Sequence, residues 1–178
     1  MMKEHYRQSM NMQTDNEDFL KLIQDNRGII FKICNSYCHN KTDREDLAQE
    51  IIYNLWSSGN SFTGNHKFST WMYRVSLNVA ISFYRKEKKL DHIIPLAESL
   101  TEIAYKDDGQ QELEQNINLL QQFINELKEL DRALMILYLE SKTYIEIAEI
   151  LGITETNVAT KISRIKEKLK QKFSYINQ

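Results

Sequence analysis

Apolar side chains recur at intervals of three and four residues along most of the chain, which is the period of an α-helix. One such series in the N-terminal half consists of Ile29, Ile30, Ile33, Cys34 and Tyr37. The chain contains only five glycines and one proline, too few turn-formers for a sandwich or barrel of many short strands. The pattern therefore predicts an all-α protein.

A second predicted helix starts near residue 42 and is followed by a loop. Thr42 and Glu45 fit a capping box, in which the hydroxyl accepts a backbone N–H and the carboxylate reaches back to the cap. The helix that they open buries one apolar face and carries a separate outward arc. That arc contains Asp46, Gln49, Glu50 and Tyr53. The loop from residue 57 to 67 contains glycine and asparagine, and we expect its Phe62 to be exposed.

A long helix is predicted over residues 68–89, with an apolar stripe formed by Met72, Val75, Val79 and Phe83. Beside this stripe, seven residues fall within an arc of about 80° at 100° per residue. They are Lys67, Trp71, Arg74, Asn78, Ser82, Arg85 and Lys89. A basic face that carries an aromatic ring suits nucleic acid, since cations meet phosphates and rings stack on unpaired bases. An amphipathic helix with Trp71 packed in a core explains the same pattern, and both interpretations stay open.

The C-terminal part has the pattern of a helix-turn-helix. Helices are predicted over residues 112–127 and 131–140, and Thr143 with Glu146 forms a second capping box. Gly152 ends the short helix that follows, and Thr154 can cap a longer helix that runs to about residue 173. The buried stripe of that last helix consists of Val158, Ile162, Ile165 and Leu169. A helix, a tight glycine turn and a longer helix are the parts of this DNA-binding motif.

Polar and basic residues share the opposite face of the last helix, namely Asn157, Thr160, Lys161, Arg164 and Lys168. Asn157 and Thr160 can read base edges, whereas the three cations can pair with phosphates. The alternative, a helical hairpin with a solvated lysine-rich tail, does not explain the whole spacing. The pattern favours DNA binding.

The charge distribution divides the chain. The net charge of −2 argues at first against a nucleic-acid ligand. Residues 1–89 carry +3, residues 90–131 carry −8 and residues 132–178 carry +3, while residues 66–89 alone carry +5. With Pro95 and a turn-like Asp107-Asp108-Gly109, the acidic stretch predicts a flexible linker. We therefore expect a disordered tail over 1–13, a helical domain over 14–89, a linker over 90–111 and a helix-turn-helix domain over 112–175.

Other features indicate a reduced and soluble setting. Cys34 and Cys38 are spaced by one helical turn and fit half-buried reduced thiols better than a metal site with His39. The N-terminus has no apolar core typical of a signal peptide, and the apolar run 133–139 is far shorter than the roughly 20 residues of a membrane span. We expect a cytoplasmic protein without membrane insertion, metal or cofactor.

Three stretches together resemble the extracytoplasmic-function class of bacterial sigma factors. Residues 43–50 (DREDLAQE) resemble the family's helix that docks on the polymerase clamp, and residues 68–75 (FSTWMYRV) with Asn78, Arg85 and Lys86 resemble its promoter-melting segment. Residues 144–164 resemble its helix-turn-helix for the minus-thirty-five element. The resemblance covers residues 16–173, and the order of the three stretches across an acidic linker is highly specific.

The resemblance implies a transcription initiation factor, not an enzyme, that directs core RNA polymerase to promoters. Its partners would be the clamp of the polymerase β′ subunit, the β flap, promoter DNA and an anti-sigma factor. Contacts with polymerase would come from Asp46, Gln49, Glu50, Tyr53, Asn54 and Trp56. The melted minus-ten element would contact Phe62, Lys67, Trp71, Arg74, Asn78, Ser82, Arg85, Lys86 and Lys89. The minus-thirty-five element would contact Thr154, Thr156, Asn157, Thr160, Lys161, Arg164 and Lys168.

The resemblance also gives roles to the loop and the linker. Residues 62–67 would form a pocket for a flipped minus-ten base, and the acidic linker would enter the cleft where RNA lies. A simple soluble spacer explains the linker equally well. Three positions depart from the family's pattern, namely Leu77, Ser82 and Ala159. At Ala159 a lysine is usual, so one phosphate contact is missing.

Two other functions agree less well with the sequence. A response-regulator-like helix-turn-helix regulator would share the C-terminal helices, but it needs an α/β receiver, and the N-terminal half shows no alternation of strands and helices. A di-metal helix-bundle enzyme would need Glu-x-x-His pairs, and the sequence contains none. Gly-rich phosphate loops and nucleophile elbows are also missing from the sequence.

Overall fold

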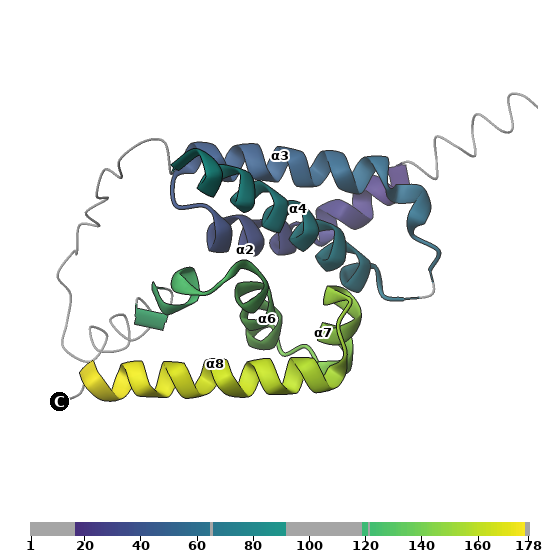
Figure 1. The fold of residues 1–178 in the computed structure, drawn as a ribbon. Helices are drawn as coiled ribbons and strands as arrows, with labels where there is room; N and C mark the ends of the chain where they lie inside the picture. Colours follow the sequence, from purple (N-terminus) through teal and green to yellow (C-terminus); the bar gives the residue numbers. More distant parts are fainter. Residues whose placement is uncertain (1–16, 65, 92–118, 121, 177–178) are drawn as a thin grey trace, which may run out of the picture.

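The computed structural model describes residues 17–64, 66–91, 119–120 and 122–176. Every regular element in these ranges is helical, which confirms the predicted all-α fold. Residues 17–25 form a first helix and residues 122–126 a short one. The labelled helices of Figure 1 are α2 (Arg27–Tyr37), α3 (Lys41–Ser57), α4 (Phe68–Asp91), α6 (Glu129–Leu139), α7 (Tyr144–Leu151) and α8 (Glu155–Ile176). A 3-10 turn, η1 (Gly59–Ser61), follows α3.

The predicted tail lies outside the described residues, as does nearly all of the predicted linker. Residues 90 and 91 are an exception, because α4 continues through them to Asp91. Within the described ranges, no helix is long and apolar enough to cross a membrane.

The first helical unit consists of residues 17–25 and helices α2, α3 and α4, which pack side by side (Figure 1). Its core contains the fully buried Ile33, Leu47, Ile51, Leu55 and Met72. These side chains follow the helical periodicity of the sequence, so the buried faces of α2 and α3 lie where the apolar spacing predicts them.

The predicted capping box at Thr42 is wrong, because α3 begins at Lys41 with Asn40 as its cap. The side-chain oxygen of Asn40 accepts a hydrogen bond from the backbone N–H of Asp43 at 2.7 Å. Asparagine is at least as good a cap as threonine, and its position lets α3 start one residue before Thr42.

The second helical unit consists of α6, α7 and α8. Thr143 and Glu146 form the predicted capping box at the start of α7, and Gly152 ends that helix with a φ of 66°. The Thr154 hydroxyl accepts the backbone N–H of Asn157 at 3.2 Å and so caps α8. Helix α6 begins at Glu129, two residues earlier than predicted, and α8 continues to Ile176. The helix-turn-helix pattern is therefore confirmed.

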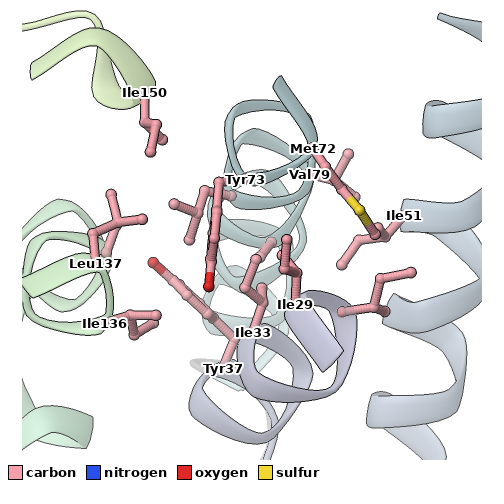
Figure 2. Packing of buried hydrophobic residues seen from close by; sticks show 14 of the residues in the cluster. Ile29, Ile33, Tyr37, Ile51, Met72, Tyr73, Val79, Ile136, Leu137 and Ile150 are labelled. Atoms are coloured by element: carbon pink, nitrogen blue, oxygen red, sulfur yellow. The ribbon is translucent and has the colours of Figure 1, made fainter. Parts of the chain in front are cut away.

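The two units dock through a common apolar core. Figure 2 shows Ile136 and Leu137 of α6 and Ile150 of α7 facing Tyr37 and Tyr73 of the first unit. The Tyr37 hydroxyl donates a hydrogen bond to the backbone carbonyl of Glu129 at 2.8 Å. Periodicity identifies which residues are apolar on a helix, but it does not reveal that two separate units cover one another.

Arg132 of α6 is fully buried at this junction. Its guanidinium lies 4.6 Å from the ring centroid of Tyr84 and 5.2 Å from that of Tyr37. Its nitrogens donate hydrogen bonds to the backbone carbonyls of Ser36, at 3.1 Å, and Asn125, and to the Tyr84 hydroxyl at 3.3 Å. Within the described ranges no carboxylate forms a salt bridge with it. Carbonyls and aromatic faces therefore replace a counter-ion.

Both cysteines are free and buried, rather than half-buried as predicted. Burial raises the pKa of Cys34 to about 11 and that of Cys38 to about 12, which favours inert thiols. Among the described residues, no group of three or more histidine, cysteine, aspartate or glutamate side chains could hold a metal ion.

Candidate nucleic-acid interface

Helix α4 presents a polar row to solvent along its length. Arg74, Asn78, Ser82, Arg85 and Lys86 are all exposed. The exposure of Arg74, Asn78, Ser82 and Arg85 agrees with the arc that the helical spacing predicts. Lys86 lies outside that arc, and its Nζ atom is 4.0 Å from a Glu50 carboxylate oxygen. The backbone of Lys89 continues α4, and its side chain lies outside the described residues. The exposed cations can pair with phosphates on one side of the helix.

The buried side of α4 is wider than the predicted apolar stripe. Met72 and Val79 are buried and Val75 and Phe83 are half-buried, but Tyr73, Leu77 and Ala80 are also buried. The reason is that α4 packs against α2 and α3 on one side and against α6 and α7 on another. Tyr73 faces the second unit, where its hydroxyl lies 3.3 Å from the carboxylate of Glu140.

Trp71 belongs to a cluster of aromatic rings at the N-terminal end of α4. Its ring centroid lies 5.4 Å from that of Phe68, 5.7 Å from that of Phe62 and 5.9 Å from that of Phe19. The indole N–H donates a hydrogen bond to the Ser61 hydroxyl oxygen at 3.1 Å. Trp71 is half-buried, so it packs against the core and still presents part of its ring to solvent.

The prediction that Phe62 is exposed is wrong. The residue is half-buried because its ring packs at 90° against Phe68, with 5.3 Å between centroids. The loop from η1 to α4 is therefore held against the helix by aromatic contacts. Edge-to-face pairs of this kind add about 0.5–1.5 kcal/mol beyond the area that they bury.

Acidic residues of α7 reach His66 and Lys67, which precede α4. Lys67 lies 3.6 Å from a Glu146 carboxylate oxygen, and His66 lies 2.7 Å from Glu149. His66 was not among the predicted contacts, although its place beside Lys67 in the loop was a usable signal. In the docked arrangement, acidic side chains of the second unit therefore lie beside one end of the α4 face.

The outer face of α8 is polar and open. Exposed side chains are Thr154, Thr156, Asn157, Thr160, Arg164 and Lys168. Lys161 is half-buried and forms a 2.8 Å salt bridge with Asp131 of α6, so it is less available than the spacing suggests. The Thr160 hydroxyl donates a hydrogen bond to the Thr156 carbonyl at 2.9 Å, which leaves its oxygen free to accept.

The outward arc of α3 forms a third surface. Asp46, Gln49, Tyr53 and Trp56 are exposed, with 70% of Tyr53 and 44% of Trp56 accessible. Glu50 and Asn54 are half-buried and adjacent, since the Asn54 amide donates to the Glu50 carbonyl at 2.8 Å. Ile52 is 47% exposed on the same helix and was missed, because an isoleucine beside Ile51 suggests core from sequence.

The family model for Sigma-70 region 2 matches residues 22–90, and that for Sigma-70, region 4 matches residues 117–169. Two proteins of Bacillus subtilis (strain 168) are similar over most of the chain. The ECF RNA polymerase sigma factor SigW is 32% identical over 168 residues, covering 88% of this chain and 89% of SigW. The RNA polymerase sigma factor YlaC is 31% identical over 137 residues, covering 75% of this chain and 79% of YlaC.

Two solved structures share the fold at 18% sequence identity. CnrH, in complex with the cytosolic domain of CnrY, superposes with a TM-score of 0.62 and covers 88% of each chain. The sigma factor RpoE of Bartonella quintana, in complex with the anti-sigma factor NepR, superposes with a TM-score of 0.58. That match covers 89% of this chain and 96% of RpoE.

Proposed function

The chain belongs to the extracytoplasmic-function (ECF) class of the sigma-70 family, and from this membership we propose which of its surfaces contact polymerase and promoter DNA. It is a transcription initiation factor that binds core RNA polymerase and directs it to promoters. Sigma factors as a group are not enzymes. We propose that this chain likewise has no catalytic activity of its own and acts in the cytoplasm, where its polymerase works.

We propose that region 2 spans residues 14–89 and region 4 residues 112–175, with a linker over 90–111. The matched ranges 22–90 and 117–169 fall almost entirely inside these limits. Residues 90–111 contain five acidic side chains and one lysine, and this acidity would suit entry of the linker into a cleft that otherwise holds RNA. A spacer without that role would tolerate neutralisation of the linker's acids, which transcription assays can measure.

The α4 face is proposed to hold the melted minus-ten element. The observation that carries this proposal is a row of exposed polar and basic side chains that ends at the partly open ring of Trp71. Arg74 and Arg85 would pair with phosphates, while Trp71 would stack on an unpaired base. The loop from Phe62 to Lys67 would border the captured base.

The α8 face is proposed to read the minus-thirty-five element in the major groove. Asn157 lies in the first turn of α8, where a recognition helix contacts base edges. Arg164 and Lys168 lie further along the same exposed face and would pair with phosphates. Lys161 would have to exchange its salt bridge with Asp131 for a phosphate.

The α3 face is proposed to bind the polymerase clamp. Exposed aromatic and acidic side chains lie together there, and aromatic residues are enriched in protein interfaces. Trp56 and Tyr53 would supply the apolar contact and Asp46 the charge. An anti-sigma partner is inferred from membership of the class. Of the two solved structures with the same fold, CnrH is in complex with the cytosolic domain of CnrY, and RpoE is in complex with the anti-sigma factor NepR.

The described structure does not support the alternative of a response-regulator-like helix-turn-helix regulator. It requires an α/β receiver in the N-terminal half, whereas residues 17–64 and 66–91 contain only helices, turns and loops. No described feature favours it over a sigma factor.

Run-off transcription with bacterial core polymerase and candidate promoters tests the proposal. We expect promoter-dependent transcripts only when the chain is present, and no binding of polymerase would refute it. Trp71→Ala should slow promoter opening but leave duplex binding by region 4 intact. Unchanged opening in a variant of normal stability would show that Trp71 serves the core alone.

A further inference from the structure

Phe19 supplies the ring around which the aromatic cluster is built. It comes from the helix over residues 17–25, and it precedes the matched region-2 range that starts at residue 22. Its ring centroid lies 5.8 Å from that of Phe68, 5.9 Å from that of Trp71 and 6.3 Å from that of Trp56. One half-buried ring thus touches the start of α4 and the end of α3.

The ring of Phe19 meets its two neighbours on α4 edge-on. The interplanar angle is 85° with Phe68 and 65° with Trp71. In this orientation the positive edge of one ring faces the negative face of another, which ties the angle of the indole to the position of Phe19. The indole is further restrained by its hydrogen bond to Ser61.

The 3-10 turn η1 also packs against the ring of Phe19. A Cβ atom added to Gly59 would come within 3.0 Å of the Cε1 and Cζ atoms of the Phe19 ring. The absence of a side chain at Gly59 therefore permits this close approach. Since Ser61 belongs to the same turn and accepts the indole N–H of Trp71, Phe19 supports both the turn and the indole.

We propose that Phe19 is a positioning residue for capture of the minus-ten base. It acts through Trp71 and η1, which it holds at the angle and separation that leave part of the indole open to an unstacked base. This inference rests on the proposed minus-ten role of the α4 face. It adds a residue that lies outside the α4 arc and outside the loop.

The contact of Phe19 with Trp56 determines how the inference is tested. Trp56 belongs to the proposed polymerase surface, so a change at Phe19 can also weaken polymerase binding. The measurement therefore uses preassembled holoenzyme at saturating core polymerase. The probe is a single-stranded non-template oligonucleotide with the minus-ten element of a promoter active in run-off transcription. A matched oligonucleotide carries an abasic site at the position where loss of the base weakens wild-type binding most.

The ratio of the affinities for the intact and the abasic oligonucleotide reports recognition of the base, because a general loss of holoenzyme stability would weaken binding of both oligonucleotides. Phe19→Ala should lower the preference for the intact oligonucleotide by about five-fold, the scale of lost aromatic edge contacts. Phe19→Leu should retain more of the preference, and Gly59→Ala should reduce it by displacing an intact Phe19 ring. The control is Leu20→Ala, because Leu20 is 50% exposed and adjacent in sequence, and its ratio should equal that of the wild type.

The same variants also distinguish failure of the positioning role from failure of the proposed minus-ten role of the α4 face. If Trp71→Ala lowers the ratio while Phe19→Ala, Phe19→Leu and Gly59→Ala all leave it unchanged, the positioning role is overturned. If Trp71→Ala also leaves the ratio unchanged, the minus-ten assignment of the α4 face fails, and the positioning role fails with it. If Phe19→Ala does not fold, the milder Phe19→Leu and Gly59→Ala variants decide.

Discussion

Replacing Arg132 by leucine should loosen the docking of the two helical units. Leucine keeps much of the apolar volume but removes the charge and every hydrogen-bond donor. Arg132 is fully buried, and its partners on the first unit are the Ser36 carbonyl, the Tyr84 hydroxyl and the rings of Tyr37 and Tyr84. The substitution therefore removes a buried set of polar contacts between the two units.

The size of the effect follows from opposing contributions. Hydrogen bonds to a charged group contribute about 1.5–3 kcal/mol each, and a desolvated cation–π contact about 2 kcal/mol. Desolvation of the guanidinium offsets several kcal/mol of this gain. Leucine would also leave the carbonyls of Ser36 and Asn125 without their donor. We expect a net loss of about 3 kcal/mol, or roughly 100-fold in the ratio of docked to undocked molecules.

Two spectroscopic probes report the two units differently. Both tryptophans, Trp56 and Trp71, belong to the first unit, whereas far-ultraviolet circular dichroism reports all helices. In the wild type the two unfolding curves in guanidinium should coincide, because the units share a core. In Arg132→Leu they should separate, and small-angle scattering should show a larger radius of gyration.

The matched control is Arg27→Leu, which removes the same charge from an exposed position at the start of α2. Its curves should coincide like those of the wild type. Coincident transitions and an unchanged radius of gyration in Arg132→Leu would refute the reasoning, since docking would then not depend on the polar contacts of Arg132.

Undocking bears on promoter binding under the proposed assignment. Lys67 at the start of α4 lies 3.6 Å from Glu146 of α7, and α8 begins shortly after α7. The two reading surfaces therefore begin close together. Elements about 25 base pairs apart lie roughly 85 Å apart along B-DNA, whereas α4, with 24 residues, and α8, with 22 residues, are each only about 35 Å long. Arg132→Leu should accordingly not slow promoter association, and an acceleration is the expected direction.

The remaining predictions concern single sites. Arg164→Ala should weaken upstream-element binding evenly across sequences and lower its salt slope by about 1, measured by anisotropy titrations at several salt concentrations; a loss confined to one base position would contradict it. Because burial raises the pKa of Cys34 to about 11 and of Cys38 to about 12, both thiols stay protonated at neutral pH, and an aromatic disulfide reagent should label the native protein far more slowly than the unfolded one. Thr143→Ala should cost about 1 kcal/mol in urea unfolding, and a wild-type midpoint would contradict the cap. The Thr143 backbone N–H lowers the pKa of Glu146, so its stabilisation is present above the unfolded pKa and lost as pH falls through the lower folded value. The difference in free energy of unfolding between the wild type and Glu146→Gln should therefore disappear on acidification.

Local interactions explain what could be predicted from the sequence. The capping box at Thr143, the glycine that ends α7 and the buried stripe from Val158 to Ile165 each depend on residues a few positions apart. The exposed arcs of α3, α4 and α8 follow from the helical repeat for the same reason. The wrong cap at Thr42 shows the limit of such reasoning, because two good caps stood two residues apart and only one could be used.

Contacts between distant segments were decided by the tertiary structure alone. Trp71 packs against Phe19, more than 50 positions away in sequence, and the ion pairs of Lys67 and Lys161 are made with acids of other helices. Arginine is seldom fully buried, yet Arg132 is buried because residues from both helical units contact it. Periodicity shows which face of a helix is apolar, but only the tertiary structure determines how many other helices pack against it.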